Sequence, residues 1–263
     1  MSISIKDNFR LPAICQAEGA RVLKQHYPQS EIGTTFSCSH IEAFRPIEKD
    51  RLAVQRVDAL VNRLFIEPAL GMGYPVKDLR FLEKLEKYWN PGDENLLKFD
   101  FDFIGVQNYT RELVKHSCLI PYLRANIVKA EKRNVPVTLM KWEVYPESLF
   151  HMLKKFDAYP EVKKLYVTEN GAAFNDILAN GEIDDVKRTK YIKQYLDAVL
   201  RAKNSGVNVQ GYFVWSFTDN FEWAEGFYPR FGLVYIDFET QKRIVKSSGK
   251  WYRDFLKEPG LMH

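Results

Sequence analysis

Apolar residues recur every three to four positions in five segments of the chain, which is the spacing of one buried face of a helix. The clearest case has Tyr191, Ile192, Tyr195 and Leu196 on one face, with Gly206 just past its end. We expect helices over residues 11–26, 50–65, 146–156, 184–203 and 247–257. Asp50 is suited to cap the start of the second of these helices.

Short segments rich in apolar, β-branched and aromatic residues lie between the predicted helices and indicate strands over residues 31–37, 101–106, 163–168 and 210–217. Residues 231–238 and 243–246 are predicted to pair as a small hairpin. Alternating strands and helices favour parallel βαβ units, and the continuous apolar strand at 101–106 favours a sheet covered on both faces. The expected class is α/β, in one domain over residues 1–263, with residues 1–10 as a candidate disordered amino terminus.

Composition narrows the classes of function. The formal net charge is +4, but Lys and Arg are interspersed with Asp and Glu, so nucleic acid is not an expected partner. No apolar run suits a signal peptide or a membrane span, which favours a cytoplasmic protein without a membrane partner. Cys15, Cys38 and Cys118 lie far apart, without the paired spacing of a metal site or a disulfide framework. We therefore expect reduced thiols, no metal and no cofactor.

Polar and aromatic residues gather where the predicted strands end, as they do at the carboxyl-terminal rim of a (β/α) barrel. Glu169 follows one strand, and the segment 215–223 follows another with two Trp and two carboxylates. Trp faces stack on sugar rings, and a carboxylate can accept two adjacent hydroxyls. Each feature alone has a simpler interpretation, a polar turn for residues 168–171 and a packed core for the tryptophans. Two such strand ends in one chain favour a sugar site.

The chain resembles the carboxyl-terminal part of family 1 of the glycoside hydrolases, the β-glucosidase family, from about Leu11 to its end. The resemblance rests on five segments in the family's order and spacing: 102–110 (DFIGVQNYT), 142–147 (WEVYPE), 167–171 (VTENG), 215–223 (WSFTDNFEW) and 230–235 (RFGLVY). It implies the TIM (β/α)8-barrel fold. This chain would then be a partial barrel that carries about the last four βα units.

The resemblance also implies roles for individual residues. Glu169 becomes the nucleophile of a retaining β-glycosidase, and Tyr109 the phenol that hydrogen-bonds it. Trp215 becomes the platform beneath the sugar. Glu222 is expected to bind the hydroxyls at sugar carbons 4 and 6, and Trp223 the hydroxyl at carbon 3.

Three further expectations concern the substrate. Trp142 is assigned to substrate binding. Gln107 stands where the family usually has Asn, and we expect that departure to affect only a peripheral polar contact. Because the family's 6-phospho-β-glucosidases carry a small hydroxyl residue in place of Glu222, a carboxylate there favours an unphosphorylated β-linked sugar.

The family's acid/base glutamate, in a Thr-x-Asn-Glu-Pro motif, has no counterpart in this sequence. Glu67-Pro68 and Glu258-Pro259 are interpreted as ordinary chain punctuation, since neither follows a strand. A full barrel has eight strands in about 250 residues, so four strands leave two edges and an inner face for another body to cover. That body is a second copy, a chain that supplies the first four strands, or neither if the chain is a truncated product. The alternative function is a non-catalytic sugar-binding or partner-dependent half-barrel module.

Overall fold

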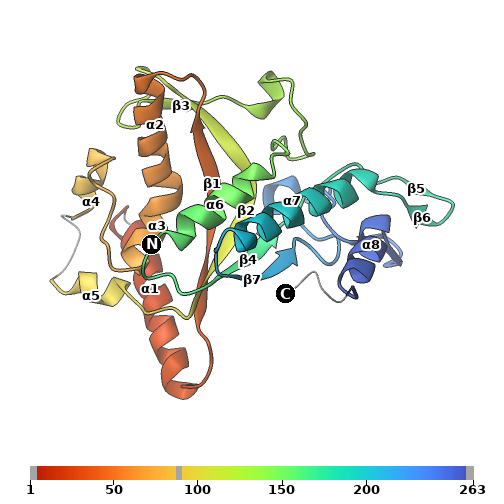
Figure 1. Ribbon diagram of the computed structural model, residues 1–263, viewed down its shortest axis with the longest axis horizontal. Helices are drawn as coiled ribbons and strands as arrows, with labels where there is room; N and C mark the ends of the chain where they lie inside the picture. The colour runs from red at the N-terminus through yellow and green to blue at the C-terminus, as the bar shows by residue number, and fades with distance from the viewer. Residues whose placement is uncertain (1–4, 87–90, 259–263) are drawn as a thin grey trace.

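A computed structural model describes residues 5–86 and 91–258 (Figure 1). Its centre is a parallel sheet with the strand order β1-β2-β4-β7, formed by Gly33–Ala43, Phe103–His116, Leu165–Asn170 and Val209–Val214. A short strand, β3 (Ala125–Ile127), pairs antiparallel with the far end of β2. The predicted α/β class and the four parallel strands in chain order are confirmed.

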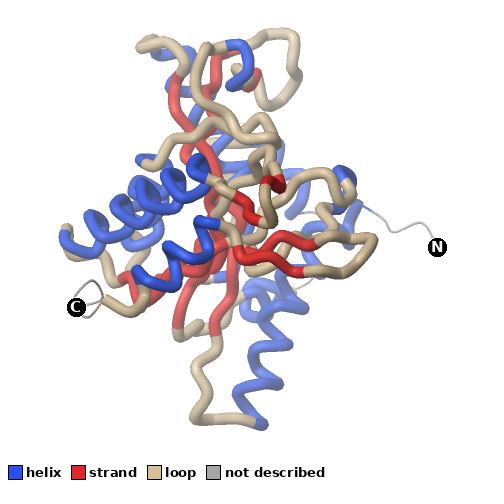
Figure 2. Tube along the Cα trace, turned by 90° about the vertical axis from the view of Figure 1, so that its right-hand side faces the viewer, coloured by secondary structure: helices blue, strands red, loops and turns tan. Residues whose placement is uncertain are grey.

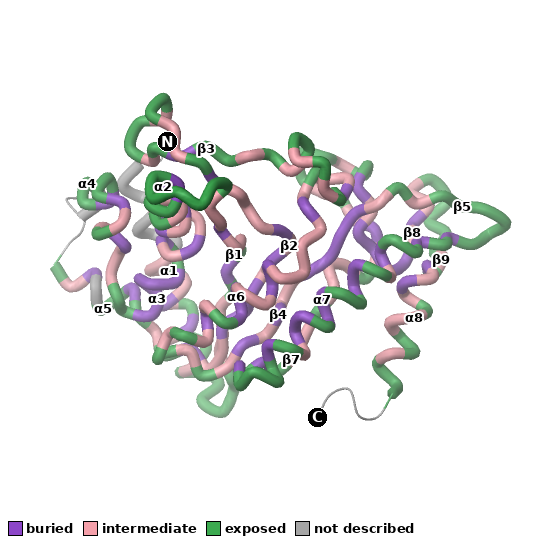
Figure 3. Tube along the Cα trace, turned by 45° about the horizontal axis from the view of Figure 1, so that its top comes forward, coloured by how far each residue is buried: buried purple, intermediate pink, exposed green. Residues whose placement is uncertain are grey.

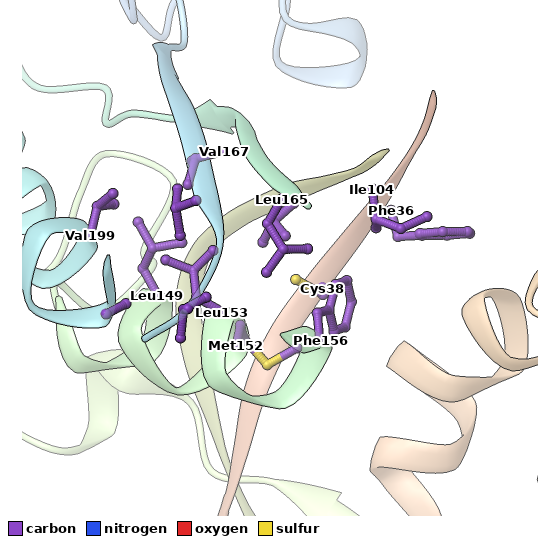
Figure 4. Packing of buried hydrophobic residues seen from close by; sticks show 14 of the residues in the cluster. Phe36, Cys38, Ile104, Leu149, Met152, Leu153, Phe156, Leu165, Val167 and Val199 are labelled. Atoms are coloured by element: carbon purple, nitrogen blue, oxygen red, sulfur yellow. The ribbon is translucent and has the colours of Figure 1, made fainter. Parts of the chain in front are cut away.

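Helices α6 (Glu147–Asp157) and α7 (Val186–Asn204) lie side by side and cover one face of the sheet. Alternate strand residues point into this layer because side chains of a strand alternate between its faces. The buried members include Phe36, Cys38, Ile104, Val106, Leu165 and Val167. They pack against Leu149, Met152, Leu153 and Phe156 of α6, as Figure 4 shows. The main core therefore lies between the sheet and these two helices.

The opposite face of the sheet is open. Thr35 and Ser37 of β1 are exposed, although their neighbours Phe36 and Cys38 are buried. On β7, the Phe213 side chain is 58% exposed. The burial colouring of Figure 3 shows the buried positions concentrated along the strands and on the faces of the helices that pack on them. The expectation of a sheet covered on both faces is thus wrong for this chain, whereas the expected open inner face is confirmed.

The predicted helix over residues 50–65 is three consecutive segments: α2 (Glu48–Asp58), a π-helical turn η1 (Ala59–Arg63) and α3 (Leu64–Ala69). Asp50 does not cap it, because the cap position is Ile47. The Asp50 carboxylate is instead buried and accepts hydrogen bonds from the Arg45 guanidinium (2.9 Å) and the His116 backbone N–H (2.8 Å). It therefore ties the start of α2 to the end of β2.

The first helix, α1 (Ile5–His26), begins six residues before the predicted position 11. Residues 5–10 lie within α1 and residues 1–4 lie outside the described residues, and the disordered terminus expected over residues 1–10 stays a prediction. The Arg21 guanidinium donates to the backbone carbonyls of Asn95 and Leu96 at 2.9 and 3.1 Å. These contacts join α1 to a connection that contains η2 (Arg80–Leu82), α4 (Glu83–Glu86) and α5 (Asp93–Leu97), three short segments that the periodicity did not predict.

Two small hairpins lie outside the main sheet, and Figure 2 draws their strands in red. One, β5 (Leu178–Ala179) with β6 (Glu182–Ile183), was not predicted. The other, β8 (Val234–Ile236) with β9 (Arg243–Val245), confirms the predicted hairpin and leads into the last helix, α8 (Ser247–Phe255). Short 3-10 turns, η3 (Ala130–Lys132) and η4 (Trp223–Glu225), lie in the loops after β3 and β7. Among the described residues, no helix is both long and apolar enough to cross a membrane.

Candidate active site

The Glu169 carboxylate is held at the carboxyl end of β4 by two neutral donors from β2. The Tyr109 hydroxyl donates to Oε2 at 2.7 Å, and Gln107 Nε2 donates to Oε1 at 2.8 Å. A shift in the β2–β4 register after Val106 places Glu169 directly opposite Gln107. Both carboxylate oxygens are therefore oriented before any ligand binds.

Burial, strengthened by the hydrogen bond to Glu169, raises the pKa of the Tyr109 phenol well above its ordinary value of 10. The phenol therefore stays protonated over any physiological pH and acts as a donor to Glu169. The predicted contact between Tyr109 and Glu169 is present. The expectation that Gln107 affects only a peripheral contact is wrong, because the longer Gln side chain reaches the carboxylate itself.

A buried network behind Glu169 was not anticipated from the sequence. Asn170 is fully buried and its side-chain amide donates to the backbone carbonyl of Asn108 at 2.7 Å. Its Oδ1 accepts the Tyr212 hydroxyl at 2.7 Å. The hydroxyls of Tyr191 and Tyr195, on α7, both donate to the Tyr109 backbone carbonyl at 3.3 Å. The α7 helix thus fixes the backbone of Tyr109, which donates to Glu169, and the only signal in the sequence was the Tyr pair on its buried face.

Trp142, Tyr109 and Phe231 form an aromatic cluster beside the carboxylate. The ring centroids of Trp142 and Tyr109 lie 5.2 Å apart, and those of Trp142 and Phe231 lie 6.2 Å apart. The next residue, Glu143, is buried and accepts hydrogen bonds from Arg111 at 2.9 and 3.0 Å and from Arg133 at 2.7 Å. Trp142 therefore lies against the aromatic ring of Tyr109, and its backbone is anchored by buried ion pairs.

Trp215 directly follows β7 and reaches the end of β4, since its backbone N–H donates to the Asn170 carbonyl at 2.8 Å. The two backbones come so close that a Cβ on Gly171 would lie 1.9 Å from the Trp215 carbonyl oxygen. Only glycine fits this approach. The peptide bond between Trp215 and Ser216 is cis. The sequence-predicted residues Glu169 and Trp215 are thus neighbours in the fold.

Glu222 and Trp223 lie in a turn after Trp215, closed by a hydrogen bond from the Glu222 N–H to the Gly226 carbonyl at 2.7 Å. Burial is the main reason that the pKa of Glu222 is raised; hydrogen bonding to Trp215 opposes the shift, and the charge of Glu169 adds to it. Oε2 of Glu222 is buried and has no hydrogen-bond partner among the described residues. The Trp223 side chain is 80% exposed. The turn thus offers one unpaired carboxylate oxygen and one uncovered indole.

Asp219, the second carboxylate of this segment, has a different role. It is buried and accepts hydrogen bonds from Lys246 Nζ at 2.8 Å and the Arg230 guanidinium at 2.7 Å. Lys246 also pairs with Asp176, which pairs with Arg188 of α7. This buried ion cluster joins the loops after β4 and β7 to the β8–β9 hairpin, and so positions the segment that carries Trp215 and Glu222.

The sequence contains no Thr-x-Asn-Glu-Pro segment, and the structure places Glu67 away from any such role. Glu67 is buried within α3, where Oε1 accepts Arg63 Nε at 2.5 Å and the Tyr159 hydroxyl at 3.2 Å. Glu258 follows α8, and Pro259 lies outside the described residues. Neither glutamate follows a strand.

An oriented carboxylate, a tryptophan and a glutamate with an unpaired oxygen thus gather at the carboxyl ends of parallel strands, which is the rim where (β/α) barrels build their sites. The chain belongs to glycosyl hydrolase family 1, whose model matches residues 10–261. This confirms the family, the α/β barrel-type fold and the partial length.

Relatives within the family are named after different activities. "Beta-glucosidase A" of Thermotoga maritima is 37% identical over 247 residues, which cover 93% of this chain and 54% of that protein. A "6-phospho-beta-galactosidase" of Clostridium acetobutylicum is 46% identical over 274 residues, covering 95% of this chain and 58% of the relative. The solved "Family 1 b-glucosidase from Thermotoga maritima" superimposes with a TM-score of 0.90 at 35% identity over 97% of this chain and 57% of that one. The chain thus spans about half the length of the relatives it matches.

Proposed function

We propose that this chain is the nucleophile-bearing half of a retaining β-glycosidase that acts on unphosphorylated β-glycosides. The observation that carries the proposal is the pair of donors on Glu169, Tyr109 at 2.7 Å and Gln107 at 2.8 Å from its two carboxylate oxygens. Neutral donors keep a carboxylate oriented while leaving it charged, as a nucleophile must be.

In the proposed reaction, the Glu169 carboxylate attacks the anomeric carbon and the glycosidic bond breaks. The leaving oxygen takes a proton from an acid that the other half of the barrel supplies. Water, deprotonated by the same group, then cleaves the glycosyl–Glu169 ester and releases the sugar with its configuration retained. Trp215 supports the sugar face in both steps, and Tyr109 remains a hydrogen-bond donor to the nucleophile.

The choice of an unphosphorylated sugar rests on Glu222. Its Oε2 is buried without a partner, so two sugar hydroxyls would satisfy an atom that is now costly to bury. A phosphate at sugar carbon 6 would instead bring a second anion to a partly desolvated carboxylate. Two solved structures of the Thermotoga maritima β-glucosidase hold glucoimidazole and deoxynojirimycin, which are unphosphorylated ligands of that protein.

Turnover requires a partner for the open sheet. Four strands expose the edges of β1 and β7, and the sequence provides no acid/base Glu-Pro motif after a strand. We propose a body with the first four βα units as this partner. A second copy of the chain would close a barrel with two nucleophiles and no acid, and loss of acid/base help costs typically 10² to 10⁴ in rate.

The test is covalent trapping with a 2-deoxy-2-fluoro β-glucoside that carries an activated leaving group, because such a substrate needs no acid for the first step. The chain is incubated alone and with the amino-terminal half of the Thermotoga maritima β-glucosidase, and the intact mass is measured. We expect a glycosyl adduct on Glu169 in the mixture and none in Glu169→Gln. Absence of an adduct under both conditions would refute the proposal.

A second candidate is a sugar-binding module without turnover, favoured by the exposed Trp223 and the unpaired Glu222 oxygen. Calorimetry with glucose and cellobiose separates the two functions. Binding that is lost in Glu222→Ala, without an adduct on Glu169 in the trapping experiment, would support the module. Glucose 6-phosphate in the same titration tests the sugar preference, and tighter binding of the phosphorylated sugar would contradict it.

A further inference from the structure

A second cluster of metal-binding side chains lies outside the sugar site, between β1 and α6. His40 and Glu42 stand two residues apart on β1 and His151 is on α6, with one ligand atom of each within 4.8 Å of the others. His40 Nε2 and Glu42 Oε1 are already 2.8 Å apart. The imidazole rings of His40 and His151 stack with their centroids 4.5 Å apart. Three donors from two packed elements thus converge on one point.

The burial of the cluster suits a bound ion. All three side chains are partly buried, which protects a bound ion from bulk water without closing the site.

Two cations beside the cluster are already paired with carboxylates. Lys155 of α6 forms an ion pair with Asp58 of α2. Arg111 of β2 donates to Glu42 Oε2 at 2.8 Å, which leaves Oε1 for a ligand. A second partner that orients a ligating carboxylate in this way is usual around metal sites. A groove of about 430 Å³, lined by residues that include His40, His151 and Lys155, gives access from solvent.

We propose that His40, Glu42 and His151 form a binding site for a transition-metal dication of the zinc class. Two imidazoles and one carboxylate are a donor set that Zn²⁺ accepts, with bonds of about 2.0–2.2 Å and a fourth position for water. Bonds of this length place neighbouring ligand atoms roughly 3.3 Å apart. When the ion binds, His40 Nε2 and Glu42 Oε1 therefore move slightly apart from 2.8 Å, and the ligand atoms that lie up to 4.8 Å apart come closer through side-chain rotation. The site joins β1 to α6 and is independent of the proposed glycosidase function.

The sequence expectation of no metal site rested on spacing. His40 and Glu42 alternate with Ile41 along a strand, and His151 is distant in the chain. The three residues therefore form no short sequence motif that would indicate a metal site. Parallel strand β1 and helix α6 bring them together only in the folded protein. The three cysteines, which the spacing argument considered, take no part in this cluster.

The experiment uses the full chain, free of any affinity tag and stripped of metal with a chelator. Zn²⁺ and Co²⁺ are titrated by calorimetry, and the Co²⁺ complex is also followed by its visible absorption, which reports a tetrahedral nitrogen and oxygen environment. We expect one ion per chain. Zinc at about 100 times its dissociation constant should raise the thermal unfolding midpoint by roughly 5–10 °C.

His151→Gln and His40→Gln should each weaken binding at least about tenfold, while the uncomplexed variants keep the midpoint of the metal-free parent within a few degrees. His26→Gln and His116→Gln, which change histidines outside the cluster, are the matched controls and should bind as the parent does. The proposal is overturned if the parent binds no stoichiometric metal, or if the cluster variants and the control variants bind equally well.

Discussion

Three glutamates of this chain show how contacts decide the role of one residue type. Glu67 is buried against Arg63, so its charge is neutralised by an ion pair within the helical segment. Glu169 receives only neutral donors, from Tyr109 and Gln107, so its charge is oriented without being neutralised. Glu222 has a buried oxygen that finds no hydrogen-bond partner within residues 5–86 and 91–258. These three sets of contacts separate a structural carboxylate, Glu67, from the proposed nucleophile and the proposed sugar-binding carboxylate.

Glu222 predicts a pH-dependent stability difference. Because its folded-state pKa is raised above the ordinary value of 4.5, the folded chain holds the proton more tightly than the unfolded chain does. The protonated carboxyl therefore does not reduce the free energy of unfolding at low pH. The free energy of unfolding falls as the pH rises through the raised pKa. Glu222→Gln removes this loss. Urea unfolding should show the variant more stable than the parent by about 1 kcal/mol at pH 7, with a smaller difference near pH 4.

Glu225→Gln is the control for the loss of a charge in the same turn, because the Glu225 side chain is exposed. A stability difference between Glu222→Gln and the parent that does not change with pH would contradict the assignment of a raised pKa. A ligand offers an independent check, since glucose bound to the Glu222 carboxylate should stabilise the parent and not the variant.

At the scale of elements, the sequence predicted what depends on local periodicity and missed what depends on tertiary contact. Helix α7 and strand β4 were predicted within about two residues, since their apolar positions repeat at the period of the element. Asp50 was assigned to a helix cap because its side chain can accept the hydrogen bonds of a cap. Its carboxylate instead accepts a hydrogen bond from the backbone N–H of His116, which is distant in the sequence. Gln107 was taken as peripheral because one sequence does not reveal where a longer side chain reaches.

The site followed the same division. Residues whose role depends on type and strand-end position, such as Glu169 and Trp215, were predicted. The roles of Asn170 and Asp219 emerge only from burial, because an amide or a carboxylate at a strand end looks the same in sequence whether it faces a ligand or the core. Asp219 lies in the same segment as Glu222, and only its ion pairs with Arg230 and Lys246 reveal that it has a structural role.

The approach of β4 to Trp215 yields a prediction about Gly171. Alanine there would place Cβ 1.9 Å from the Trp215 carbonyl oxygen, a backbone atom that cannot move aside alone. Gly171→Ala should lower the free energy of unfolding by about 2 kcal/mol or more, measured by urea denaturation, and should change the fluorescence of Trp215. Gly19→Ala is the control: it lies exposed in α1 with no atom within 4 Å of the added carbon. That change should be neutral or stabilise by up to about 1 kcal/mol.

The buried ion cluster predicts a larger effect. Asp219→Ala leaves the fully buried Lys246 with one carboxylate fewer and frees Arg230, and unpairing a buried charge costs about 3–5 kcal/mol. Chemical denaturation should show this loss, together with faster proteolysis of the 215–223 segment. Asp254→Ala removes an exposed ion pair with Arg253 and should have a much smaller effect on stability than Asp219→Ala. Equal losses in the two variants would show that Asp219 does not hold the segment.

At the scale of the whole molecule, the chain is a sheet with one face covered by helices and one open face. Helices α6 and α7 cover the first, and Thr35, Ser37 and Phe213 lie on the second. The proposed active-site residues lie on the open side, where the proposed reaction needs a sugar and an acid from the other half of the barrel to reach Glu169. The open face and the incomplete chemistry therefore have one cause: the barrel that contains both is represented here by about half of its length.

This view predicts where a complementary half binds. Strands β1 and β7 are the two ends of the parallel sheet, so alternate backbone N–H groups on each point away from their one parallel neighbour, whereas β2 and β4 are paired on both sides. Adding the amino-terminal half of the Thermotoga maritima β-glucosidase should slow hydrogen exchange of β1 and β7 at least about tenfold. Hydrogen exchange within α6 should change less, because that helix is already packed on the covered face of the sheet. Slowing confined to α6 and α7, with β1 and β7 unchanged, would mean that the partner binds the wrong face and that the sheet does not close into a barrel.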